Sequence, residues 1–212
     1  MDLQAFYKLT YGLYIVSSFK GEKPAGCIIN TAVQVTADPV QLAVTVNKKN
    51  YTAEAIQQSG YFTVAALTQN ADMDLIGTFG FHSSRDTEKF ENFRCKRDEN
   101  GVLYVLNHTA ARFSCKVVQT VDLGTHIMFI GEATGAETLS DEPLMTYEYY
   151  HKAKKGGTPK NAPSYKGEQE AVPAKKGFRC TVCGYILEAD ELPADFKCPI
   201  CGQGADRFVP VG

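Results

Sequence analysis

Short apolar runs, separated by turn-forming residues, recur through the first 150 residues of the chain. They are rich in Val, Ile and Phe, and one of them alternates apolar with polar positions. Runs of this length and composition predict β-strands. The clearest runs are residues 13–16, 27–29, 40–46, 62–67 and 127–130. Many short strands with few helices favour a closed or partly closed β-barrel, because closure leaves no exposed strand edge.

Two helices are predicted between these strands. Thr52 is a suitable N-cap for a helix over residues 53–59, and Gly60 would end it. A second helix is predicted over residues 72–78. Because helices do not alternate regularly with the strands, a doubly wound sheet is disfavoured. No G-x-G-x-x-G segment opens a helix, so the sequence does not support a Rossmann dinucleotide site.

The composition changes near residue 151. Residues 151–177 hold seven Lys, two Glu, four Gly and three Pro, with almost no aliphatic side chains. Such a stretch is typical of an extended, solvated linker. An alternative is that residues 154–159 lie over the first domain and meet an anion there. We therefore divide the chain into a first domain (1–165), a flexible linker (166–176) and a small C-terminal domain (177–212).

The charge balance excludes several classes of protein. Lys and Arg number 22 against 24 Asp and Glu, for a net charge of -2, so a generally basic nucleic-acid binder is excluded. A hydrophobic content of 44% excludes a highly charged disordered chain. No apolar run approaches the roughly 18–20 residues of a membrane helix, and residues 1–4 lack the features of a secretory signal. We expect a cytoplasmic protein that binds neither membrane nor nucleic acid.

Four of the seven cysteines form two C-x-x-C pairs, Cys180 with Cys183 and Cys198 with Cys201. Two intervening residues let both sulfurs of a pair reach one ion, and the Gly after each second Cys lets backbone N–H groups turn toward sulfur. The hydrophobic core of so short a unit is too small to stabilise a fold without a bound metal or disulfides. The sequence therefore predicts one metal ion held by four thiolates, and tetrahedral S4 suits zinc and iron alike. We interpret Cys95 and Cys115 as structural.

The segments CTVCGY and LPADFKCPICG resemble a rubredoxin, which holds one iron by four Cys. Only 14 residues (184–197) separate the two pairs, so the similarity is to the short rubredoxin module appended to rubrerythrins. The resemblance implies iron at this site, with zinc as the alternative. It also implies an aromatic shell around the ion, formed by Phe178, Tyr185, Phe196 and Phe208.

Three segments of the first domain are candidates for ligand binding. Residues 25–31 join an apolar strand to Asn30 and Thr31, residues 47–52 begin the first predicted helix, and a loop brings His82, Ser83, Ser84 and Arg85 together. Helix N-terminal N–H groups beside Lys, Asn and Thr favour an anion. Taken singly, each segment is better explained as a turn, a cap or an ordinary loop.

Together the motifs AGCIINTAVQVTADPVQLAV, NKKNYTAEAI, GTFGFHSSRDTEKF and GTHIMFIGEA resemble the flavin reductase-like, FMN-binding split-barrel family. The resemblance implies a mainly β split barrel, a homodimer and an FMN site. The flavin ring would lie on Cys27, Ile28, Ile29, Asn30 and Thr31. Its phosphate would be held by Asn50, Thr52, Ser83 and Ser84, with Asn47, Lys48, Phe81 and His82 also at the cofactor.

Two further roles follow from the same resemblance. His126 would be catalytic, near the flavin ring and the nicotinamide. His82 stands where relatives carry a basic residue, so phosphate binding would depend more on Arg85 or Lys48.

The pairing of the two domains resembles the high-molecular-weight rubredoxins of anaerobic bacteria. That resemblance implies hydride transfer from NADH or NADPH to FMN, single electrons passing to the Fe(Cys)4 centre, and delivery to a flavodiiron-type reductase of O2 or NO. A flavin or ferric reductase that releases its reduced product is the first alternative. A zinc-bearing docking module beside a flavin-binding scaffold is the second.

Overall fold

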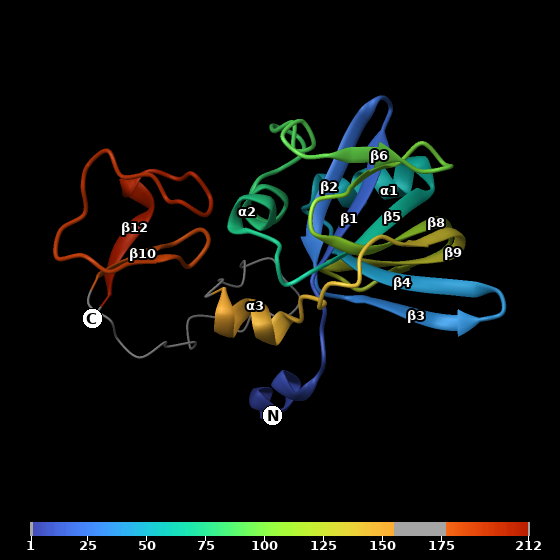
Figure 1. Cartoon of the computed structure of the whole chain (residues 1–212), viewed down its shortest axis with the longest axis horizontal. Helices are drawn as coiled ribbons and strands as arrows, with labels where there is room; N and C mark the ends of the chain where they lie inside the picture. Colours follow the sequence, from blue (N-terminus) through green and yellow to red (C-terminus); the bar gives the residue numbers. More distant parts are fainter. Residues whose placement is uncertain (1, 155–176, 212) are drawn as a thin grey trace.

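The computed structural model describes residues 2–154 and 177–211 (Figure 1). The first part is built on a seven-stranded antiparallel sheet in the order β2-β1-β5-β8-β9-β4-β3. The predicted mainly β architecture is therefore confirmed. The strands of this sheet are β1 (Tyr14–Lys20), β2 (Lys23–Ile29), β3 (Ala32–Ala37), β4 (Val40–Asn47), β5 (Tyr61–Leu67), β8 (Thr109–Asp122) and β9 (His126–Thr138).

The sheet curls so that its two outer strands, β2 and β3, are joined directly through residues 30 and 31. At that junction the Thr45 N–H donates to the Thr31 carbonyl at 3.2 Å, so β4 supports the turn. A separate hairpin, β6 (Cys95–Arg97) with β7 (Leu103–Val105), lies outside the barrel. All five predicted strands are present. Strand β8 was not predicted because polar and exposed positions interrupt its apolar pattern.

Two apolar clusters lie on opposite faces of the sheet. The cluster inside the barrel includes Phe62, Phe129 and Ile56, so helix α1 (Tyr51–Ser59) closes one end. The outer cluster packs β1 and β5 against helices α2 (Met73–Phe81) and α3 (Tyr147–Ala153), with Phe79 and Tyr150 as its large aromatic members. Helix α1 packs on one face of the sheet and α2 on the other, so that both faces are buried. This packing brings the loop before α1 and the loop after α2 close to β2.

Both predicted helices are present, but the N-cap of the first and the C-terminal end of the second differ from the predictions. Asn50, not Thr52, is the N-cap of α1, and Gly60 ends the helix at φ 75° as predicted. Thr52 is only 1% exposed, because it points from the first helical turn toward the barrel instead of capping it. Helix α2 begins where predicted, with the Leu75 N–H donating to Asp72 Oδ1 at 2.8 Å. It continues to Phe81 because its apolar side chains cover the outer core.

Residues 151–153, which were predicted to belong to an extended segment, are helical. Helix α3 reaches Ala153, since Tyr150 is buried in the outer core and Thr146 Oγ1 accepts from the Tyr149 N–H at 3.1 Å. The predicted linker 166–176, and most of the lysine-rich stretch, lie outside the described residues. A short 3-10 helix, Leu3–Lys8, precedes the barrel. No helix in the two described ranges is long and apolar enough to cross a membrane.

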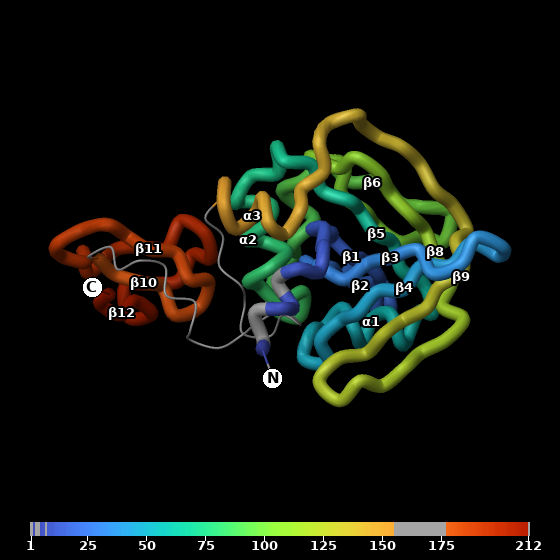
Figure 2. Tube along the Cα trace, turned by 90° about the horizontal axis from the view of Figure 1, so that it is seen from below, coloured from blue at the N-terminus to red at the C-terminus, as the bar shows by residue number. Residues whose placement is uncertain are grey.

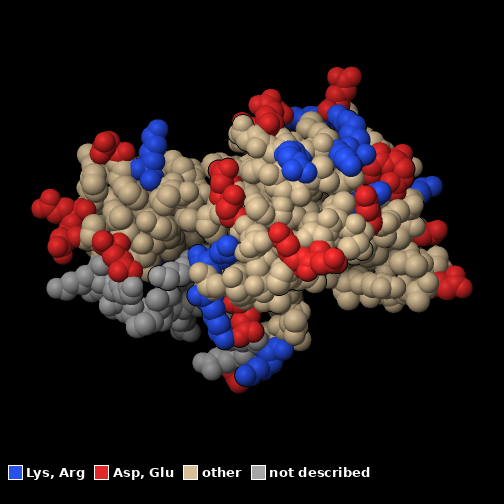
Figure 3. Space-filling model, viewed as in Figure 1, with Lys and Arg blue, Asp and Glu red and all other residues tan. Residues whose placement is uncertain are grey.

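The C-terminal unit is a three-stranded sheet in the order β11-β10-β12, with β10 (Gly177–Cys180), β11 (Ile186–Leu187) and β12 (Phe208–Val211). A 3-10 turn, Ala205–Arg207, leads into β12. Two views at right angles place this unit beside α2 and α3, on the side of the barrel away from the β3–β4 hairpin (Figures 1 and 2). Carboxylates outnumber cations on the visible face of this unit, whereas both signs are mixed over the barrel (Figure 3).

Candidate functional site

Four buried cysteines form a candidate metal centre in the C-terminal unit. Their Sγ atoms all lie within 4.8 Å of one another, with 3.6 Å between those of Cys180 and Cys201 and 3.4 Å between those of Cys183 and Cys198. A tetrahedral ion with metal–sulfur bonds of about 2.3 Å holds its ligands about 3.8 Å apart. The four sulfurs are therefore placed to surround one ion.

The two cysteine pairs share one backbone geometry. The Gly184 N–H donates to the Cys180 carbonyl at 2.9 Å, and the Gly202 N–H donates to the Cys198 carbonyl at 2.8 Å. Gly184 and Gly202 have φ of 82° and 68°, a region that other residues enter at a cost. This turn directs the N–H groups of Tyr185 and Gln203 at the sulfurs of Cys183 and Cys201. The predicted role of both glycines is confirmed.

The donor set itself fits a thiophilic cation. Burial raises the pKa of Cys201 to about 12. It also raises the pKa of Cys183, with the sulfurs of Cys198 and Cys180 adding to the effect. Four thiolates are stable in such a place only around a positive charge, and binding releases their protons.

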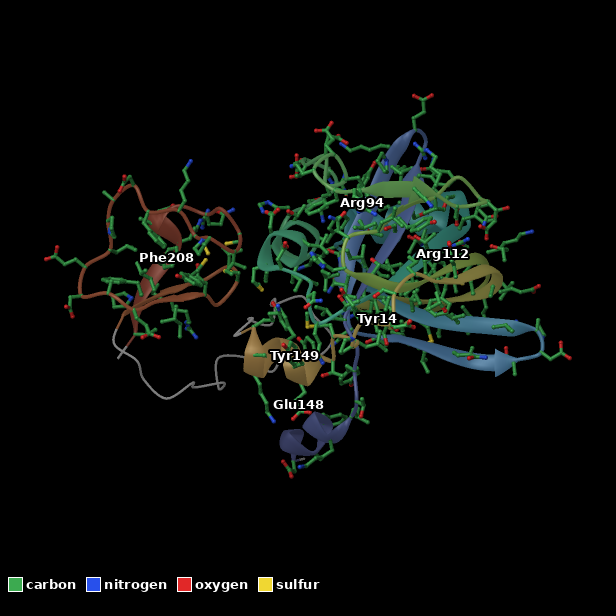
Figure 4. The ribbon with its side chains drawn as sticks, viewed as in Figure 1. Tyr14, Arg94, Arg112, Glu148, Tyr149 and Phe208 are labelled. Atoms are coloured by element: carbon green, nitrogen blue, oxygen red, sulfur yellow. The ribbon has the colours of Figure 1, made fainter. Side chains whose placement is uncertain are left out.

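Aromatic side chains surround the sulfurs as expected. Phe208 is buried in the cysteine cluster, and Phe178, Tyr185 and Phe196 pack against it. The rings of Phe196 and Phe208 meet edge to face with centroids 5.3 Å apart. Figure 4 shows the sulfur atoms on the side of Phe208 that faces α2. This shell limits water at the centre, which tunes the potential of a bound metal.

The first candidate segment for flavin, residues 27–31, lies at the end of β2. Cys27 and Ile29 point into the barrel core, whereas Ile28 points to the outer core, as alternation along a strand requires. Asn30 is buried, and Thr31 Oγ1 donates to its Oδ1 at 3.0 Å. Cys27 is hydrogen-bonded by Thr52 and Asn50, and burial raises its pKa. The structure therefore brings this segment together with the start of α1.

The second candidate segment meets His126 across the β4–β9 pair. Asn47 is directly opposite His126, with Nδ2 and Nε2 3.5 Å apart. The other ring nitrogen, Nδ1, is 2.8 Å from Thr125 Oγ1. Lys48 faces away, in an ion pair with Asp122 at 2.6 Å. Asn47 and His126 thus form one group, and Lys48 is already neutralised at the surface.

The third candidate segment, 81–85, divides into buried and exposed parts. Ser84 is 2% exposed and bonds the backbone of Gly26, whereas Ser83 is exposed and accepts from the Arg85 N–H at 3.1 Å. Burial lowers the pKa of His82. Arg85 pairs with Glu54 and stacks over Tyr51. Phe81 packs against the cysteine cluster of the other unit.

Lys89 is the residue of this site that sequence reasoning missed. It is 3% exposed, and its Nζ donates to the Gly26 carbonyl at 2.9 Å and to the Phe79 carbonyl at 3.2 Å. Burial lowers its pKa to about 8. The signal that the sequence offered for a buried cation was the position of this Lys directly before an apolar residue, Phe90. Only the fold shows that this cation lies beside Cys27 and His82.

A cavity of about 380 Å³ opens beside Asn30 and Thr31. Its walls are mostly apolar. They come from the stretch before β1, the start of β3 and the segment leading to α3, and include Tyr11, Tyr14, Val33, Leu67, Leu144 and Met145. Figure 4 marks Tyr14 between the barrel and α3. Concave, mostly apolar sites with a few polar groups are typical of cofactor pockets.

Comparisons with known proteins match both parts of the chain. Residues 6–158 match the flavin reductase like domain, and residues 178–209 match the rubrerythrin, rubredoxin-like domain. The chain is 40% identical over 229 aligned positions to the high molecular weight rubredoxin of Moorella thermoacetica, covering 100% of both chains. It is 46% identical over 165 residues to the ferric-chelate reductase (NAD(P)H) of Archaeoglobus fulgidus, covering 78% of this chain and 98% of that protein.

A solved structure shows the same fold as the first domain. The NADH:FAD oxidoreductase of Streptomyces globisporus C-1027 superposes with a TM-score of 0.61 at 19% identity, over 67% of this chain and 83% of that chain. The chain therefore belongs to the flavin reductase-like family, as a member that carries a C-terminal rubredoxin-like domain in the manner of the high molecular weight rubredoxins.

Proposed function

We propose that this protein is an NAD(P)H-dependent electron-transfer flavoprotein. It takes hydride from NADH or NADPH onto FMN and passes single electrons to an Fe(Cys)4 centre. A separate terminal reductase of the flavodiiron type then receives them. The observation that carries the proposal is the four-cysteine centre joined in one chain to a flavin reductase-like barrel and packed against its helix α2.

Bound FMN supplies two-electron chemistry toward a nicotinamide and one-electron chemistry toward iron. The residues of the chain bind and orient it. Lys89, with the N–H groups that begin α1, supplies positive potential for the phosphate. Asn30 and Thr31 face the mostly apolar cavity that would take the ring. His126, held by Thr125 and Asn47, is positioned to orient the nicotinamide.

The second redox site of the proposed protein is the four-cysteine centre of the C-terminal unit. Cys180, Cys183, Cys198 and Cys201 would hold iron, and N–H groups aimed at sulfur stabilise the thiolates. The aromatic shell keeps water away from the metal. Iron at this site would accept one electron at a time from FMN, which is the group that converts the paired electrons of a nicotinamide into single ones.

The proposed active form is a homodimer. Val33 and Val35 on β3 are 55% and 46% exposed, and Leu144 beside the cavity is 56% exposed. Contiguous apolar surface of this kind is typical of an interface between copies. Val33 and Leu144 also line the cavity, so a second copy packed on β3 would close it.

An anaerobic visible titration tests the proposal. We expect flavin bands and ferric–thiolate absorption in the purified protein, and bleaching of both by limiting NADH or NADPH. Metal analysis on the same sample distinguishes iron from zinc. Bound zinc, or ferric absorption that persists after the flavin is reduced, would rule out the internal relay.

A second candidate function is a reductase that releases its product, either free reduced flavin or ferrous chelate. The relative named ferric-chelate reductase (NAD(P)H) aligns over 98% of its length with 78% of this chain. That observation favours a barrel complete as a reductase on its own. Turnover with excess free FMN or a ferric chelate that is unchanged in Cys183→Ser would support this second function.

A further inference from the structure

The geometry points to an intramolecular docking surface on α2, where Gly77 and Phe81 receive the second cysteine pair of the rubredoxin-like unit. The occupant is the chain's own segment 198–201. Its part in electron transfer rests on the function proposed above, whereas the docking itself rests on the contacts alone. The surface is defined by Gly77 and Phe81.

Gly77 makes the closest contact of this surface. A Cβ at Gly77 would lie 2.1 Å from the carbonyl oxygen of Ile200 and 3.3 Å from its carbonyl carbon. Side-chain atoms do not approach a carbonyl oxygen so closely, and the atom met is backbone, which cannot rotate aside. A Gly inside a helix costs about 1 kcal/mol relative to Ala. The close approach of Ile200 explains why Gly occupies the middle of α2.

Phe81 extends the surface by one helical turn. It is four residues after Gly77, so the two share a face of α2. Phe81 packs against the cluster formed by the four cysteines and Phe208. Both contacts of α2 therefore involve the cysteine-bearing end of the unit, which Figure 4 shows turned toward α2.

The docked position places the metal centre against Phe81, which opens the candidate segment 81–85. Phe81 ends α2, and the loop that follows is tied to β2 through Ser84 and Gly26. The path from the cysteines to β2 thus runs through one aromatic side chain and one hydrogen-bonded loop. In this position one electron would leave the reduced flavin and convert one ferric ion to ferrous. A separate acceptor that needs the same face of the unit must displace it from α2.

Two alanine substitutions in the same helix test the surface. Gly77→Ala places a Cβ against Ile200. Gly80→Ala is the matched control, because its Cβ would meet Ile28 Cγ1 at 3.6 Å, an ordinary contact inside the barrel domain. Both variants gain helix propensity, so loss of folding does not separate them. Flavin absorbance and the rate of flavin reduction by NADH verify that each variant is intact.

The measurements use the full, iron-loaded chain. Small-angle X-ray scattering reports whether the two units remain together, and anaerobic stopped flow reports the rate of iron reduction after the flavin is reduced. We expect Gly77→Ala to show a larger radius of gyration and iron reduction slowed tenfold or more, while Gly80→Ala matches the natural chain. Gly77→Ala identical to the natural chain in both measurements would overturn the docking surface. If NADH reduces no iron even in the natural chain, the proposed function fails, and the scattering comparison alone decides the docking.

Discussion

The side chain of Ser84 is hydrogen-bonded to both the backbone N–H and the backbone carbonyl of Gly26. The Ser84 Oγ accepts from the Gly26 N–H at 3.0 Å and donates to the Gly26 carbonyl at 3.2 Å. Lys89 donates to the same carbonyl. Two side chains of the loop after α2 are therefore bonded to Gly26 of β2. The resemblance assigned one of them, Ser84, to the phosphate, and in the structure it ties the loop to the strand.

Ser84→Ala is expected to destabilise the protein by about 1–3 kcal/mol, because it leaves a buried N–H and carbonyl of Gly26 with fewer partners. Urea unfolding of the flavin-free protein measures this change. Ser83→Ala is the matched control, since Ser83 is exposed and its loss should cost less than about 0.5 kcal/mol. An unchanged unfolding midpoint together with weaker FMN binding in Ser84→Ala would instead make Ser84 a direct ligand.

Lys89→Met tests the buried cation. The folded-state pKa of Lys89 is lowered by burial to about 8, below the ordinary value of 10.5. The unfolded chain thus binds more protons between these values, so the flavin-free protein should gain stability as pH rises from 8 to 10.5. The full difference is on the order of 3 kcal/mol. Lys89→Met should remove this gain and weaken FMN binding.

The measurement is the difference in unfolding free energy between the natural chain and Lys89→Met at several pH values. Lys49→Met is the control, because Lys49 is exposed on the loop before α1 and its loss should leave the pH dependence unchanged. Equal FMN affinity in Lys89→Met and Lys49→Met would show that Lys89 does not contribute to phosphate binding.

Cys183→Ser should lose the metal and leave flavin reduction intact. The C-terminal unit has a small core centred on the four cysteines, so without the ion it is expected to unfold. Metal analysis, the visible spectrum and hydrogen exchange over residues 177–211 follow the loss, and NADH oxidation with FMN follows the barrel. Cys95→Ser, outside the cluster, is the control. A parallel loss of flavin reduction in Cys183→Ser would contradict the modular arrangement.

Val35→Lys tests the proposed dimer. Val35 lies exposed on β3, and a charge there would have to be buried between two copies, which is unfavourable. We expect a monomer in sedimentation velocity and weaker flavin binding, because the cavity beside Thr31 would stay open. Val209→Lys, on exposed β12 of the C-terminal unit, should leave the mass unchanged. A natural chain that sediments as a monomer would refute the dimer outright.

The sequence by itself determined the metal centre, because everything it needs is local. Two cysteines with two residues between them, followed by Gly at a left-handed φ, build the same turn twice. The strands at 40–46 and 62–67 were equally readable, since apolar residues dominate both runs and the polar positions, Gln41, Thr45 and Thr63, are single ones. Strand β8 was not, because its outward positions are polar and its pairing partners, β5 and β9, are what define it.

The tertiary structure alone decided what the polar residues of the first domain do. Thr52 faces the core instead of capping α1, Ser84 bonds a strand 58 residues away, and Lys89 is buried while Lys48 is neutralised at the surface. These outcomes depend on the closure of the barrel and on the register of β2, which no local pattern encodes. The same holds for Gly77, which weakens the helix in which it lies. Its lack of a side chain is explained by the close approach of the Ile200 carbonyl, more than a hundred positions further along the chain.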